Sequence, residues 1–167
     1  PLHICHIAAI SMGLYVFTNI KFFFEVGYFF GLSGNFLAII TPDLDFSFPD
    51  AEYITYYFGH GLLLLGVIYA CVCTKVQLTW WSVLRVLLFA ICLLPIIYGL
   101  NIYISQFFKD VNYWYLMITP AANTLLDIFP SPPMHIPYLA VLTVIIFTLI
   151  YLPFKYLNKN SYLNYQQ

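Results

Sequence analysis

The sequence predicts an all-α integral membrane protein, a bundle of five transmembrane helices with short turns and one long, partly ordered outer loop. Of its 167 residues, 62% are hydrophobic and only 8% are charged, whereas soluble domains carry roughly 25% charged residues. Aromatic residues make up 20% of the chain, and many of them stand where apolar segments meet loops. Such residues form the aromatic belts at both bilayer interfaces.

Each predicted helix is an apolar segment near the length that crosses a bilayer, which is about 20 residues. The five segments lie near residues 2–20, 23–41, 53–73, 80–104 and 134–153. They make residues 1–154 a single transmembrane bundle and leave residues 155–167 as a polar cytoplasmic tail. Because the chain begins with proline rather than methionine, we expect it to be a piece of a longer protein.

Positive charges orient the bundle, because cytoplasmic loops carry an excess of Lys and Arg. With five spans, Lys109 falls on one side, and the other side holds Lys21, Lys75, Arg85, Lys155 and Lys159. We therefore expect a multi-pass protein of a bacterial cell membrane, with its first residue on the non-cytoplasmic side and its C-terminus in the cytoplasm. A net charge of −1 without a basic patch argues against nucleic acid as a partner.

The first helix opens with two histidines around a thiol, in the order His3, Cys5 and His6. A helix turns about 100° per residue, so Cys5 points away from His3, and neither histidine is well placed to activate the thiol. A chemical role for Cys5 therefore needs a partner from another helix. The structural alternative is that Cys5 is a small buried apolar residue and that the histidines lie in the lipid headgroup layer.

His60 lies between Gly59 and Gly61, well inside the third segment. At about 1.5 Å per residue, it stands on the order of 10 Å below the outer end of its helix. An ionisable side chain at that depth is costly without a partner, so His60 predicts a functional site toward the outer side of the membrane. The alternative is a structural histidine whose imidazole is satisfied by hydrogen bonds.

Further polar residues on the outer side are candidates to support this site or to bind a substrate. Besides Asp43 in an acidic loop, they are His3, His6, Asn101, Asn112, Tyr113, Asp127 and His135. The long connection 105–133 is too aromatic for a flexible linker, so we expect it to place a short interfacial or re-entrant helix over the site.

Other features predict packing rather than chemistry. Gly27 and Gly31 have the small-residue spacing that lets two transmembrane backbones approach closely. Glu25 and Arg85 stand near the cytoplasmic ends of two helices, so an ion pair between them is expected to keep both charges in the membrane. The remaining thiols, without CxxC spacing, are expected to be free and are Cys71, Cys73 and Cys92.

Several segments together resemble one family, the YwaF-like integral membrane proteins. The segments are Pro1-Leu2-His3-Ile4-Cys5-His6, Gly31-Leu32-Ser33-Gly34 running into Thr41-Pro42-Asp43-Leu44, Phe58-Gly59-His60, and Asn112-Tyr113 followed by Leu125-Leu126-Asp127. The resemblance covers nearly the whole chain and implies a family fold of six or seven helices. Animal relatives include a membrane acyltransferase for ether phospholipids that is thought to use a cysteine, which implies Cys5 as the acyl-accepting nucleophile.

Three hypotheses follow. The first is a lipid transacylase that needs no cofactor, with membrane lipids as partners, Cys5 as thioester carrier, His60 as general base and Asp43 orienting an imidazole. The second is a metal-dependent membrane lipid hydrolase, with zinc ligands drawn from His3, His6, His60, His135 and Asp43. The third is a non-enzymatic transport or ligand-binding subunit, in which intramembrane His and Asn line a cavity.

Overall fold

The structure is a computed structural model that describes residues 2–74, 76–109, 111–119 and 128–164. Within these ranges the chain is helical and contains no strand. The elements are α1 (Ile4–Thr18), α2 (Lys21–Ile40), α3 (Ala51–Cys73), α4 (Trp80–Ile104), the short 3-10 helix η1 (Tyr113–Tyr115) and α5 (Ile136–Asn164). The predicted all-α membrane bundle is confirmed.

In the part of the chain that the structure describes, four helices are long and apolar enough to cross a membrane, namely α2, α3, α4 and the Ile136–Lys155 part of α5. The helix α1 is shorter than the predicted segment 2–20. It ends at Thr18, and the capping residue Asn19 has a left-handed backbone (φ 55°) and donates its N–H to the Tyr15 carbonyl. With 15 residues, α1 is about 22 Å long, less than the roughly 30 Å of the bilayer hydrocarbon core. By contrast, α5 continues past the predicted segment to Asn164.

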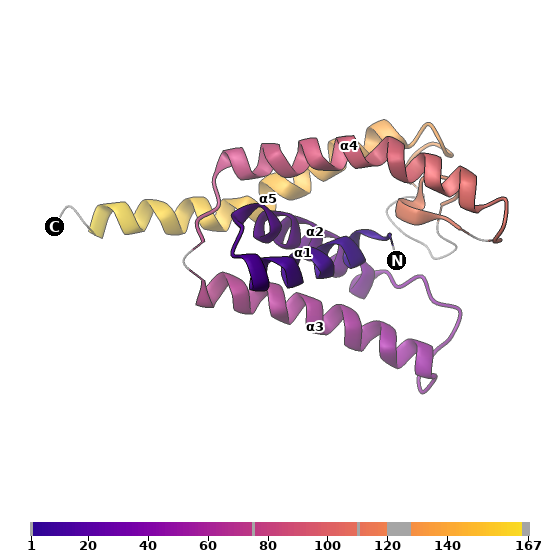
Figure 1. Ribbon diagram of the computed structural model, residues 1–167, viewed down its shortest axis with the longest axis horizontal. Coiled ribbons are helices and arrows are strands. Elements are labelled where there is room, and N and C mark those ends of the chain that lie inside the picture. The colour runs from indigo at the N-terminus through magenta and orange to yellow at the C-terminus, as the bar shows by residue number, and fades with distance from the viewer. Residues whose placement is uncertain (1, 75, 110, 120–127, 165–167) are drawn as a thin grey trace.

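The helix α2 lies at the centre and contacts each of the other four α-helices (Figure 1). Its glycines allow the closest of these contacts. A Cβ at Gly27 would collide with α1, a Cβ at Gly31 would lie 2.9 Å from Val67 Cγ2 of α3, and a Cβ at Gly34 would lie 2.9 Å from Ile4 Cγ2 of α1. The predicted close approach at Gly27 and Gly31 is therefore confirmed, with α1 and α3 as the partners.

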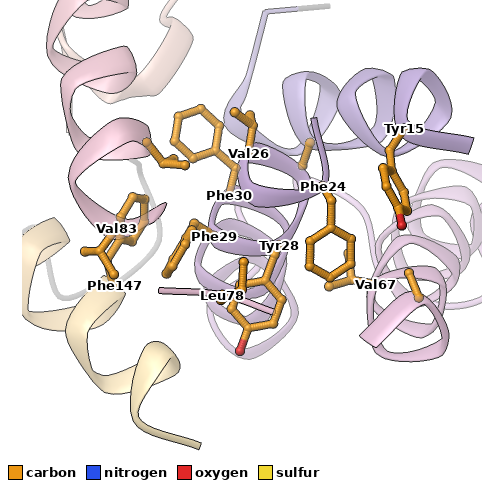
Figure 2. Packing of buried hydrophobic residues seen from close by; sticks show 13 residues of the cluster. Tyr15, Phe24, Val26, Tyr28, Phe29, Phe30, Val67, Leu78, Val83 and Phe147 are labelled. Atoms are coloured by element: carbon orange, nitrogen blue, oxygen red, sulfur yellow. The ribbon is translucent and has the colours of Figure 1, made fainter. Parts of the chain in front are cut away.

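Aromatic side chains of α2 fill the interior of the bundle. Phe29 stacks toward Phe147 of α5 with ring centroids 5.0 Å apart, and Phe24 lies beside Tyr15 of α1 (Figure 2). The Tyr28 hydroxyl donates a hydrogen bond of 2.7 Å to the carbonyl of Ile150 in α5. The other helices thus pack against α2 through a core of aromatic side chains.

An ion pair joins α2 to α4 at one end of the bundle. The Glu25 side chain is fully buried, and its Oε1 accepts hydrogen bonds from Arg85 Nη2 at 2.6 Å and from Ser82 Oγ at 2.7 Å. Lys21 Nζ lies 3.7 Å from the same oxygen. The predicted Glu25–Arg85 pair is confirmed. The candidate site lies toward the opposite end of these helices.

Candidate functional site

Cys5 occupies the first turn of α1, where its Sγ lies 3.7 Å from Nδ1 of His6. The thiol therefore contacts a histidine of its own helix, which the angular spacing of the residues alone did not predict. The first turn has no preceding turn to confine its side chains, so adjacent ones can rotate toward each other. The positive end of the α1 dipole also favours a negative charge on the Cys5 sulfur. Burial nevertheless raises the pKa of the Cys5 thiol above its ordinary value, so the thiol stays protonated until a base removes its proton.

His60 is held by its own helix. Its Nδ1 lies 2.8 Å from the Tyr56 carbonyl oxygen, one turn earlier in α3, and the two rings are 4.2 Å apart. Because a carbonyl oxygen only accepts, Nδ1 carries the proton and Nε2 keeps its lone pair. The Tyr56 hydroxyl in turn donates to the Ala38 carbonyl of α2 at 3.0 Å. The Tyr56 carbonyl therefore orients His60 from within α3.

His3 lies among aromatic rings just before α1. Its ring centroid is 5.1 Å from that of Tyr113, 6.1 Å from that of His6 and 6.2 Å from that of Tyr115. Burial lowers the pKa of His3, and repulsion from His6 and, more weakly, from His60 lowers it further. The histidines of α1 and α3 thus lie within electrostatic reach of one another, and His3 is held in its neutral form.

The turn η1 covers the start of α1. Trp114 Nε1 donates to the Leu2 carbonyl at 2.9 Å, and the indole packs edge-on against Phe30 of α2. Trp114 (φ 61°) and Tyr115 (φ 52°) both have left-handed backbones, which bulky residues rarely adopt. Within the described part of the connection, the expected interfacial helix is therefore a three-residue 3-10 turn.

Three of the predicted supporting residues hold this turn. Asn101 pairs with the Tyr113 backbone through both amide atoms, at 2.9 Å and 2.8 Å. Asn112 Oδ1 accepts from the Met117 N–H at 3.0 Å, and Nε2–H of the fully buried His135 donates to the Tyr115 carbonyl at 2.8 Å. Asn101, Asn112 and His135 therefore fix the backbone that covers Cys5.

Asp43 ties the α2–α3 loop to the same turn. Its Oδ2 accepts a hydrogen bond of 3.2 Å from the Tyr115 hydroxyl. Burial raises the pKa of Tyr115, and the neighbouring Asp43 carboxylate raises it further. The Tyr115 phenol thus stays protonated and keeps donating to Asp43.

The structure brings several predicted residues together. Cys5, His3 and His6 lie at the start of α1, with His60 in electrostatic reach and Tyr113 and Asp43 at the edge of the covering turn. Asp127 lies outside the described residues. Among the residues that are described, no three His, Cys, Asp or Glu side chains are grouped so that they could hold a metal ion. They offer no preformed site of the kind that the zinc hypothesis requires.

The sequence analysis missed Tyr56, Trp114, Tyr115 and Asn35. Tyr56 stands four residues before His60, the spacing of one helical turn, which is a signal that could have identified it. Asn35 is fully buried in α2, and neither of its amide atoms has a hydrogen-bond partner within the described part of the chain. A lone Asn in an apolar span is the corresponding signal.

Among curated proteins and among solved structures, none matches the chain. Residues 1–151 match one family model, which therefore covers the whole candidate site and the spans around it. Its match and the four apolar helices establish a multi-pass membrane protein. The chain belongs to the TMEM164 family.

Proposed function

We propose that this chain is a membrane-embedded lipid acyltransferase in which Cys5 carries the acyl group as a thioester. The 3.7 Å contact between Cys5 Sγ and His6 Nδ1 at the start of α1 carries the proposal. A thiol attacks an ester only as thiolate, and because burial raises the pKa of Cys5, the adjacent His6 imidazole is needed to take its proton. The resemblance to YwaF-like proteins, which have an acyltransferase among their animal relatives, supports the same role for Cys5.

The reaction runs in two balanced steps. In the first, the Cys5 thiol gives its proton to an imidazole, and the sulfur attacks the carbonyl carbon of a phospholipid ester. The C–S bond forms, the C–O bond breaks, and the leaving alcohol takes up the proton. In the second, the hydroxyl of an acceptor lipid gives its proton to an imidazole and its oxygen attacks the thioester carbonyl, so that a new C–O bond forms, the C–S bond breaks and the Cys5 sulfur regains a proton. No oxidant, reductant or cofactor is consumed.

Two histidines share the proton transfers in this scheme. His6 lies beside the sulfur and takes the thiol proton, whereas His60 presents a free Nε2 because Nδ1 is engaged by the Tyr56 carbonyl. A base oriented by a hydrogen bond on its far nitrogen is the arrangement that general-base catalysis uses. We assign His6 to activation of Cys5 and His60 to activation of the acceptor hydroxyl.

The test is to trap the thioester. Purified protein in lipid nanodiscs is incubated with an acyl-labelled phospholipid, quenched in acid and treated with neutral hydroxylamine, which cleaves thioesters. We expect a hydroxylamine-sensitive label on Cys5 that Cys5→Ser abolishes. His6→Ala should slow its formation about 10²-fold or more, the usual contribution of a general base. His60→Ala should leave the first step largely intact and block transfer to the acceptor.

Cys73→Ser is the matched control, since this exposed thiol lies at the far end of α3 and should not affect labelling. Absence of a hydroxylamine-sensitive adduct would overturn the acyltransferase proposal. Lipid binding without an adduct would favour the ligand-binding subunit, and hydrolysis that depends on about one zinc per chain would favour the metal-dependent hydrolase.

A further inference from the structure

An apolar groove runs between α1 and α3. It has a volume of about 350 Å³, and its walls include Met12, Gly13 and Val16 of α1, Leu62 and Gly66 of α3, and Thr74 just after α3. Its lining is almost wholly apolar. Since α3 is one of the helices able to cross the membrane, the groove lies at the depth of lipid chains rather than in water.

Two glycines leave this groove open. A Cβ built on Gly13 or on Gly66 would have no atom within 4 Å, in contrast to the glycines of α2 that contact neighbouring helices. The space that side chains at these positions would fill is therefore free. The rim is formed by exposed apolar side chains, among them Val16, which is 69% exposed, and Leu62, which is 51% exposed.

The groove lies on the same two helices as the candidate site. Leu62 follows His60 by two residues along α3, and Met12 follows Cys5 by seven residues along α1. At about 1.5 Å per residue these separations are roughly 3 Å and 10 Å along the helix axes. One end of the groove is therefore close to the thiol and the imidazole, and the other end lies near Val16 and Thr74.

The lining of the groove indicates its occupant. Its walls are almost wholly apolar and lie at the depth of lipid chains, so the matching ligand is a hydrocarbon chain. The groove is partly open, so such a chain can enter it from the surrounding lipid.

We propose that this groove binds one acyl chain of a membrane phospholipid and thereby delivers its ester to Cys5. The inference rests on the proposed function. Eleven residues separate Cys5 from Val16, or about 16 Å along α1, which is close to the roughly 15 Å of one leaflet of the hydrocarbon core. The groove lines only the deeper part of this path, so an acyl chain whose ester is at Cys5 reaches the groove only if it extends past Met12.

The test uses a phosphatidylcholine with a diazirine in the middle of one acyl chain, photolysed with the protein in nanodiscs and mapped by peptide mass spectrometry. We expect crosslinks on α1 and α3 near Gly13 and Gly66. Gly66→Leu, which fills the groove, should reduce them at least tenfold. Gly99→Leu is the matched control, because Gly99 of α4 also has no atom near its Cβ position but does not line the groove. If Gly66→Leu fails to fold, Gly13→Leu and the wild-type crosslink map serve the same purpose.

Equal crosslinking in Gly66→Leu and wild type, or crosslinks spread evenly over α4, would overturn the proposal that the groove binds an acyl chain. So would capture of a free fatty-acid probe but not of the phospholipid. The crosslinking is repeated in Cys5→Ala, which cannot form a thioester. Groove crosslinks in Cys5→Ala, with no acyl adduct in the wild type, would support acyl-chain binding in the groove and contradict the acyltransferase proposal. An acyl adduct in the wild type without groove crosslinks would support the acyltransferase proposal and contradict acyl-chain binding in the groove.

Discussion

Buried polar residues in this bundle differ in whether they have partners. Asn101 is fully buried and satisfies both amide atoms on the Tyr113 backbone. Asn35 is equally buried, yet both of its amide atoms lack a partner within the described residues. An unpaired buried amide costs about 1–3 kcal/mol, whereas a paired one stabilises the fold. The two asparagines should therefore respond in opposite ways to the same substitution.

We predict that Asn35→Leu leaves the thermal unfolding midpoint unchanged or raises it, because leucine has a similar volume and no polar atom to desolvate. Asn101→Leu should lower the midpoint by several degrees, because it leaves the Tyr113 N–H and carbonyl without their partners. Differential scanning fluorimetry in one detergent measures both variants. If Asn35→Leu lost as much stability as Asn101→Leu, Asn35 would have a structural partner such as a buried water.

Among the connecting elements, the turn η1 contributes most to the site. It places two left-handed aromatic residues over the start of α1, and four side chains outside the turn hold it, namely Asn101, Asn112, His135 and Asp43. Left-handed backbone at bulky residues costs of order 1–3 kcal/mol each and persists only where the surroundings fix it. Such a turn is expected to control access to Cys5.

We predict that Trp114→Phe speeds alkylation of Cys5 several-fold, because it removes the hydrogen bond from Nε1 to the Leu2 carbonyl while keeping an aromatic ring against Phe30. The rate is followed with a small maleimide and resolved by peptide mass spectrometry, so that the other thiols are scored separately. Trp80→Phe is the control, since Trp80 packs on Tyr151, far from the site. An unchanged Cys5 rate in Trp114→Phe would show that the turn does not restrict access.

These elements also mark where sequence reasoning succeeds and fails. Length and apolarity predicted α2, α3, α4 and the start of α5 to within a few residues, because a bilayer fixes the length of a span. The Glu25–Arg85 pair was predictable because charges in lipid need partners. The turn η1 was not, since side chains from α4 and the start of α5 determine its backbone. The Cys5–His6 contact was not predicted, because the helical angle between two residues gives the directions of their Cβ atoms but not the positions that a rotating imidazole side chain can occupy.

Across the whole molecule, the two ends of the bundle differ in chemistry. One end holds Glu25 with Arg85 and Lys21, and the other holds the thiol, the histidines and the aromatic turn. The charged end fastens α2 to α4, and the groove between α1 and α3 leads from the site toward that end.

We predict that Arg85→Met destabilises the protein, because it leaves the buried Glu25 carboxylate with only the more distant Lys21. The loss should be smaller than the about 3–5 kcal/mol seen when a fully buried pair is broken, since the Arg85 side chain is 50% exposed. Adding Glu25→Leu should recover most of the loss, because the unpaired charge disappears. A double variant less stable than Arg85→Met would contradict this account.

The last prediction concerns which end of the bundle faces the cytoplasm. The Lys and Arg distribution puts the Glu25 end inside, so Cys73, exposed at the end of α3, should react only from the cytoplasmic side. A cysteine at the exposed position Ser47, in the loop between α2 and α3, should react only from outside. Both are tested as single thiols, with the other cysteines replaced by serine, using a membrane-impermeant maleimide on intact cells and on inside-out vesicles. Labelling of Cys73 in intact cells and of Ser47→Cys in vesicles would invert the orientation and make the cytoplasmic leaflet the source of the lipid that reaches Cys5.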